Sequence, residues 1–147
     1  MSVLLEVAAR VRQFIEQQCL FEGDRVGVPV WVGFSGGADS MALLLLLCEL
    51  GHRPRAVYLN HGLRGQVSDA DGAWCREFCE ARGIPFEDHR LFLADLRGAG
   101  ESVESAGRQC RLEFWERRVG GSGVVALGHH MDDAVEDMLL RLARGAN

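Results

Sequence analysis

Short apolar runs and longer amphipathic stretches alternate along the chain, and this pattern predicts strands followed by helices. Runs that are apolar and rich in β-branched or aromatic residues are typical of buried strands. Four such runs lie at Val30–Phe34, Arg55–Asn60, Ile84–Leu91 and Val124–Leu127. Because the third run is the most polar, we expect it at an edge of the sheet.

The stretches around these runs have helical patterns. The leucine-rich segment from Met41 to Cys48 predicts a helix that ends at Gly51. Ser68, with Asp71 three residues later, resembles a capping box that starts another helix. This helix is expected to run to about Arg82. The remaining helices are expected over the first twenty residues, from Ser102 or Ser105 to Val119, and over Ala134–Arg144. The first of them has an apolar stripe of Val3, Val7, Val11, Phe14, Ile15 and Cys19.

A helix followed by four strand–helix pairs is the order of an α/β fold. Strands joined by helical crossovers lie parallel, and right-handed crossovers place helices on the two faces of the sheet. We therefore predict a doubly wound, mostly parallel sheet with helices on both faces. The 147 residues suffice for one domain with a single core.

Composition excludes several classes of protein. All 16 basic residues are arginine, so the chain lacks the lysine of the Walker phosphate-binding motif and of Schiff-base enzymes. No apolar run approaches the ~20 residues of a membrane helix, and the charged N-terminal stretch is no secretory signal. We expect a cytoplasmic protein. Its five cysteines form no C-x-x-C pair, which favours reduced, mostly buried thiols over a metal cluster.

The stretch "SGGADS" lies between the first predicted strand and its helix. Gly36 and Gly37 let a ligand approach the main chain closely, and the helix start offers unpaired N–H groups. The hydroxyls of Ser35 and Ser40 add donors, so the stretch predicts an anion-binding loop. The alternative is a plain strand–helix turn in which Asp39 or Ser40 caps the helix.

The same stretch resembles the S-G-G-x-D-S loop of the PP-loop ATP pyrophosphatases, which split ATP into an adenylate and pyrophosphate. The resemblance implies ATP as cofactor, and Asp39 as the residue that helps to place Mg²⁺ on the phosphates. The residues it assigns to ATP binding are Ser35, Gly36, Gly37, Ala38, Asp39 and Ser40.

Three further stretches narrow the resemblance. "NHGLRGQVSDAD", "GESVESAGRQCR" and "GHHMDDAVEDMLLRLARG" are similar to segments of the tRNA(Ile)-lysidine synthetase family. All four motifs agree in order and spacing over about residues 30–145. The resemblance implies that residues 1–147 form the PP-loop catalytic domain at the N-terminus of a longer enzyme.

That family adenylates C2 of the wobble cytidine in an isoleucine tRNA with a CAU anticodon, and the amine of L-lysine then displaces AMP. The resemblance thus implies tRNA and lysine as partners, and also pairing into a homodimer. The residues that match catalytic positions are Asp39, Arg108, Arg111 and His130; Arg64 and Asp133 match substrate positions, and His61 lies beside the implied adenine pocket.

Arg108 and Arg111 lie three residues apart, on one face of their predicted helix. A guanidinium fork suits a phosphate or a departing pyrophosphate. The alternative is that one of them bonds a surface carboxylate such as Glu104 or Glu113.

A second polar cluster follows the fourth strand, with His129, His130, Asp132 and Asp133. If the first and fourth strands are neighbours, this cluster and the glycine loop lie side by side at the carboxyl ends of the strands and face the same ligand crevice. Its alternatives are a zinc site, or Asp132 or Asp133 as a helix cap. His89 matches no motif, and we expect it at the surface.

Two other functions stay open at this point. One is a different PP-loop tRNA-modifying enzyme of the 2-thiocytidine type, although that group carries paired cysteines. The other is a nucleotide-binding module that holds ATP without turning it over.

Overall fold

The structure, a computed structural model, describes residues 3–20, 29–60, 66–91, 103–119 and 123–129. Its elements, in chain order, are α1 (Val3–Gln17), β1 (Val30–Gly33), α2 (Ala38–Glu49), β2 (Pro54–Asn60), α3 (Gln66–Glu80), β3 (Phe86–Arg90), α4 (Val103–Val119) and β4 (Val124–Leu127). The expected last helix and the site candidates His61, Arg64, His130, Asp132 and Asp133 lie outside the described residues.

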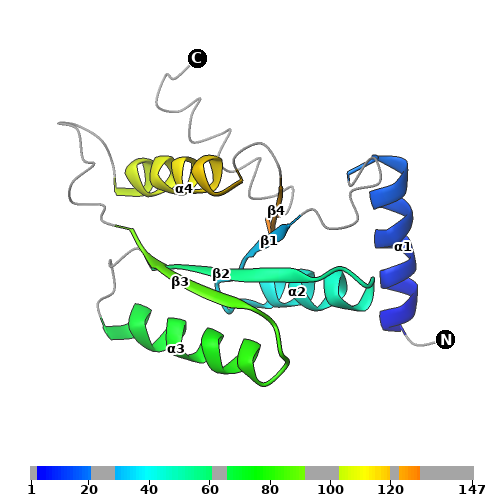
Figure 1. The fold of residues 1–147 in the computed structure, drawn as a ribbon, viewed down its shortest axis with the longest axis horizontal. Coiled ribbons are helices and arrows are strands. Elements are labelled where there is room, and N and C mark those ends of the chain that lie inside the picture. The colour runs from blue at the N-terminus through cyan, green and yellow to red at the C-terminus, as the bar shows by residue number, and fades with distance from the viewer. Residues whose placement is uncertain (1–2, 21–28, 61–65, 92–102, 120–122, 130–147) are drawn as a thin grey trace, which may run out of the picture.

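The strands form one parallel sheet in the order β3-β2-β1-β4. Helices α2 and α3 cover one face and α4 covers the other (Figure 1). The predicted doubly wound α/β fold is therefore confirmed. The crossovers from β1 to β2 and from β2 to β3 run through α2 and α3 on one face, whereas the crossover from β3 to β4 runs through α4 on the other face. The direction of winding therefore reverses between β1 and β4.

The alternating side chains of β1 supply both halves of the core. Val30 and Val32, with Phe34 directly after the strand, pack against α2 and α3 in a cluster with Leu44 and Cys75. Trp31 points to the opposite face and packs with Val57 of β2 and Trp115 of α4. Because β1 and β2 are buried on both faces, their sequences are nearly continuous apolar runs, which is typical of central parallel strands.

The polar strand β3 lies at an edge of the sheet, as predicted. Helix α1 also forms where the sequence predicts it, but most of its apolar stripe is not covered. Ile15 packs against the core, whereas Val3 and Phe14 are 77% and 56% exposed. The helix lies apart from the layers, beside the end of α2 (Figure 1), so few described apolar groups are within its reach.

One predicted helix start is wrong. Helix α3 begins at Gln66, so Ser68 lies in its first turn and does not cap it. Ser68 is instead buried, and its carbonyl oxygen accepts a hydrogen bond from the Tyr58 hydroxyl at 2.9 Å. The local capping pattern therefore does not mark the start of α3.

All five cysteines are free thiols, in agreement with the expected reduced state. Cys75, Cys79 and Cys110 are buried, and Cys19 is exposed. Burial raises the pKa of Cys75 to about 12 and that of Cys79 to about 11, so both stay protonated and unreactive at neutral pH. None of the described helices is both long and apolar enough to cross a membrane.

Candidate functional site

The stretch from Ser35 to Ser40 forms a tight loop that runs from β1 into α2. Gly36 has a φ of +80°, and a Cβ there would lie 3.1 Å from the sulfur of Cys75. The positive φ favours glycine at this position, and an added side chain would also be crowded by Cys75. The residue that caps α2 is Gly37, with no side-chain hydrogen bond, so the alternative of an Asp39 or Ser40 cap does not hold.

The two serines fold the loop onto itself. Ser35 N–H donates to Ser40 Oγ at 3.2 Å, and Gly37 N–H donates to Ser35 Oγ at 3.3 Å. The Ser40 hydroxyl donates to the Gly37 carbonyl at 3.1 Å, and Ser40 is only 6% exposed. The serines therefore hold the loop in shape, while Ser35, Gly37, Ala38 and Asp39 remain exposed to solvent.

The start of α2 leaves main-chain donors available. The first helical hydrogen bond runs from Met41 N–H to the Gly37 carbonyl at 3.0 Å. Among the described residues, the amides of Gly36, Ala38 and Asp39 have no hydrogen-bond partner. Unpaired amides at the positive end of a helix attract anions, which is the property expected of this loop.

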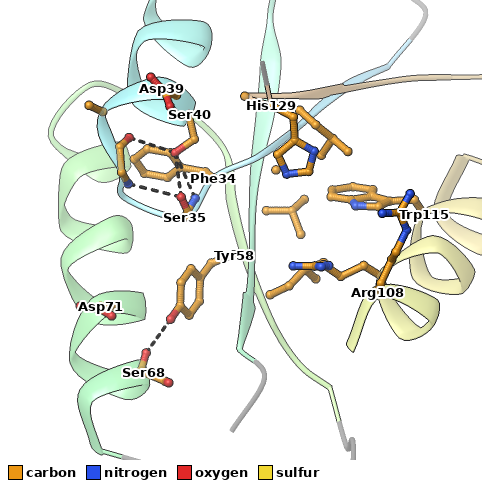
Figure 2. Close-up of a pocket in the computed structure, with 18 of the residues that line it drawn as sticks. Phe34, Ser35, Asp39, Ser40, Tyr58, Ser68, Asp71, Arg108, Trp115 and His129 are labelled. Atoms are coloured by element: carbon orange, nitrogen blue, oxygen red, sulfur yellow. Dashed lines mark hydrogen bonds between the residues drawn. The ribbon is translucent and has the colours of Figure 1, made fainter. Parts of the chain in front are cut away.

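A pocket of about 710 Å³ opens between the loop and α4 (Figure 2). It lies at the carboxyl ends of β1, β2 and β4, where the winding of the sheet reverses and where open α/β sheets bind ligands. Its lining consists of Gly33, Phe34, Ser35, Gly37, Ala38, Asp39, Ser40, Val57, Tyr58, Leu59, Ser68, Asp71, Arg108, Arg111, Leu112, Trp115, Leu127, Gly128 and His129.

Helix α4 forms the wall opposite the loop. Arg108 and Arg111 line the pocket together with Trp115, one helical turn further on. Figure 2 shows Arg108 and Trp115 reaching from α4 across the pocket toward the side of Ser35 and Tyr58. Both arginines therefore line the same pocket as the loop. Glu113 accepts hydrogen bonds from Gln109 and Arg117, both on α4. The alternative of Glu104 as a partner stays untested, because its side chain lies outside the described part of the structure.

The end of β4 closes the pocket on a third side. Strands β1 and β4 are neighbours, with Gly33 opposite Leu127, so the condition for a shared crevice is met. His129 is exposed and lies between Ser40 and Trp115 at the pocket (Figure 2). The other members of this histidine–aspartate cluster lie outside the described residues, which leaves the zinc alternative untested.

Gly128 is a site residue that sequence reasoning missed. A Cβ at Gly128 would lie 2.8 Å from the amide nitrogen of Ser40 and 3.0 Å from the carbonyl carbon of Asp39. Backbone atoms cannot move aside cheaply, so only glycine lets β4 approach the start of α2 this closely. The available signal was a glycine directly after an apolar strand.

The remaining wall comes from β2 and α3. The Tyr58 hydroxyl donates to Ser68, and Asp71 follows one turn later on α3. Burial raises the pKa of Tyr58, and the carboxylate of Asp71 raises it further, so the hydroxyl stays a donor. The buried Asn60 donates to Asp69 at 2.7 Å and fixes the start of α3 against β2.

A magnesium ion would find a suitable protein ligand at the start of α2. Asp39 is an exposed carboxylate in the first turn of α2 and lines the pocket. Within the described part of the chain, no group of three or more His, Cys, Asp or Glu could hold a metal by itself. This arrangement fits Mg²⁺, which is commonly held by one or two carboxylates together with substrate phosphates and water.

These features define a doubly wound α/β protein with a ligand pocket at the switch point of its sheet. The chain belongs to the PP-loop domain family, which matches residues 4–147.

Curated relatives agree with this assignment. Over 141 residues the chain is 43% identical to the tRNA(Ile)-lysidine synthase of Parabacteroides distasonis, covering 92% of this chain and 31% of that protein. Over 119 residues it is 44% identical to that of Chromobacterium violaceum, with coverages of 78% and 26%. The resemblance to this family is therefore confirmed. The chain spans less than a third of the length of these relatives.

A solved structure supports the fold. The NH3-dependent NAD synthetase of Campylobacter jejuni matches with a TM-score of 0.62 and 13% sequence identity, over 85% of this chain and 56% of that one. At this level of identity the match bears on the fold alone.

Proposed function

We propose that this chain is the ATP-binding catalytic domain of a longer tRNA(Ile)-lysidine synthetase. The reaction adenylates C2 of the wobble cytidine of an isoleucine tRNA, and L-lysine then displaces AMP. The observation that supports it most is one pocket that is lined both by Ala38 and Asp39, whose amides have no partner among the described residues, and by Arg108 and Arg111. Both groups suit the departing pyrophosphate of ATP.

The loop and α4 contact the phosphates from opposite walls of the pocket. The amides of Gly36, Ala38 and Asp39 bind the β- and γ-phosphates, and Arg108 and Arg111 neutralise charge from the opposite wall. Because these donors are in place before the reaction, they stabilise the developing negative charge without reorganisation. Asp39 would hold Mg²⁺ together with the phosphates, and the ion would supply further Lewis-acid stabilisation.

The second half of the reaction involves residues outside the described part of the chain. We assign His130 to contact with the reacting nucleotide or its phosphate, and Asp133 and Arg64 to substrate contact. The main chain at His61 borders the adenine pocket in this proposal. A net charge of −5 supplies little phosphate neutralisation, so we assign most tRNA contacts to the rest of the full-length protein.

Exchange of labelled pyrophosphate into ATP tests this function in the full-length protein. We expect exchange that requires both Mg²⁺ and isoleucine tRNA, because the adenylate forms on the tRNA. A tRNA without the CAU anticodon is the control and should support none. Exchange with no tRNA present, or ATP binding without any exchange, would overturn the proposal; the second outcome identifies a nucleotide-binding module.

A 2-thiocytidine synthetase is the second enzyme candidate. It predicts incorporation of sulfur, and not of labelled lysine, into the tRNA. The proposal also carries two expectations that stay predictions: a cytoplasmic location, and pairing into a homodimer.

A further inference from the structure

One face of α4 carries a row of residues that links the pocket to the edge of the sheet. Arg108, Arg111, Trp115 and Arg118 are spaced by three, four and three residues, which places them on one face of a helix. The first three line the pocket, and Arg118 lies beyond it. With a rise of 1.5 Å per residue, Arg118 is about 10 Å from Arg111 along the axis.

Arg118 is tied to the edge strand β3. Its guanidinium donates to both carboxylate oxygens of Glu87 and lies 5.8 Å from the centre of the Trp31 ring. Glu87 pairs in register with Val57 of β2, so its side chain shares the face on which α4 packs. Arg55 of β2 approaches the same carboxylate at 3.9 Å.

His89 completes this contact from a half-buried position, with 38% of its side chain exposed. Its Nε2 lies 3.0 Å from Glu87 Oε2, and its ring packs on Phe114 of α4 with centroids 4.9 Å apart. Burial pushes the pKa of Glu87 up, but hydrogen bonds from His89 and Arg118 outweigh this and lower the pKa below its usual value. The carboxylate is therefore charged at neutral pH.

Apolar packing of α4 on the sheet depends on few large side chains among those described. Trp115 is buried, and Phe114 and Val119 pack half-buried in the same cluster; Ala106 and Cys110 are buried but small, and Leu112 is 49% exposed. Small side chains interdigitate little, so they resist sliding and rotation of the helix less than large ones. The polar contact at Arg118 therefore adds a directional contact to this apolar packing of α4.

We propose that Glu87 is a positioning residue that acts through Arg118. The contact sets the rotation of α4 about its own axis and its position along the sheet, and thereby directs Arg108 and Arg111 at the phosphate-binding loop. The inference rests on the proposed function, because it takes the two arginines as phosphate ligands. It adds a residue at the far edge of the sheet, outside every motif that the sequence analysis used.

The Glu87→Gln variant of the full-length protein tests this role. It keeps the size of the side chain and removes the charge that holds Arg118. We expect the affinity for magnesium pyrophosphate to fall about tenfold, because a displacement of the order of 1 Å weakens a preorganised site by such factors. The affinity for adenosine, which has no phosphate, should stay within about twofold. Glu113→Gln is the matched control: it removes the same charge from a pair within α4 and should change neither affinity.

A double-mutant cycle shows whether the effect passes through Arg118. Arg118→Met should lower pyrophosphate affinity as much as Glu87→Gln does, and Glu87→Gln should add nothing in the Arg118→Met background. If Glu87→Gln fails to fold, the Arg118→Met arm still decides the question. Equal losses for pyrophosphate and adenosine, unchanged pyrophosphate affinity, or additive effects would overturn the positioning role. Failure of the wild-type protein to bind pyrophosphate or ATP would instead overturn the proposed function.

Discussion

Replacing Asp39 with alanine in the full-length protein is expected to abolish metal-dependent cleavage of ATP, with a loss of at least about 100-fold, while the fold stays intact. The carboxylate is the described pocket group best suited to Mg²⁺, and it lies in the turn whose amides would bind the phosphates. Because Asp39 is exposed, its loss should lower the free energy of unfolding by no more than about 1 kcal/mol, the usual range for a charge at a helix N-terminus.

Glu49→Gln is the control for this variant. Glu49 is an exposed carboxylate at the opposite end of the same helix, so its change removes one charge from α2 without touching the pocket. Pyrophosphate exchange with tRNA and the thermal melting temperature would be measured for both. Unchanged turnover in Asp39→Ala would remove Asp39 from the mechanism.

Replacing Gly128 with alanine should also have a large effect, by a different route. The added Cβ meets the backbone of Asp39 and Ser40 at 2.8–3.0 Å, so β4 and the start of α2 must move apart. Overpacking of this kind costs about 1–3 kcal/mol in stability. Because the displaced turn carries the proposed phosphate-binding amides, we expect ATP affinity to fall by about 100-fold.

Gly83→Ala separates the local effect from general destabilisation. Gly83 has a φ of +65° and no atom within 4 Å of an added Cβ, so alanine there strains the backbone but crowds nothing. We expect it to cost about 1 kcal/mol in stability and to leave ATP affinity unchanged. Comparable losses of affinity in both variants would show that Gly128 has no specific role in the pocket.

Local patterns were sufficient to predict most of the fold. Val30–Phe34 and Val124–Leu127 are apolar runs that can be recognised without knowing their neighbours, and the polar stretch at β3 predicted an edge. The loop at Ser35–Ser40 was recognisable because its glycines and serines have little other use between a strand and a helix. The spacing of Arg108 and Arg111 likewise predicted one helical face.

Contacts between distant segments could not be predicted in the same way. Glycine is needed at position 128 because β4 packs closely against the start of α2 in the folded protein. The residues around Gly128 in the sequence do not reveal this contact. Ser68 matched a capping box, yet the Tyr58 hydroxyl from β2 is what it contacts. Glu87 and Arg118 are separated by 31 residues, and each alone looks like an ordinary surface charge.

A crystal structure of the full-length protein with Mg²⁺ and a non-hydrolysable ATP analogue tests the central claim most directly. The account predicts oxygens of the terminal phosphates within about 3 Å of the amide nitrogens of Gly36, Ala38 and Asp39. It also predicts that the guanidinium of Arg108 or Arg111 contacts the same phosphates. A triphosphate bound away from this loop, or bound here with those three amides turned toward protein groups, would contradict it.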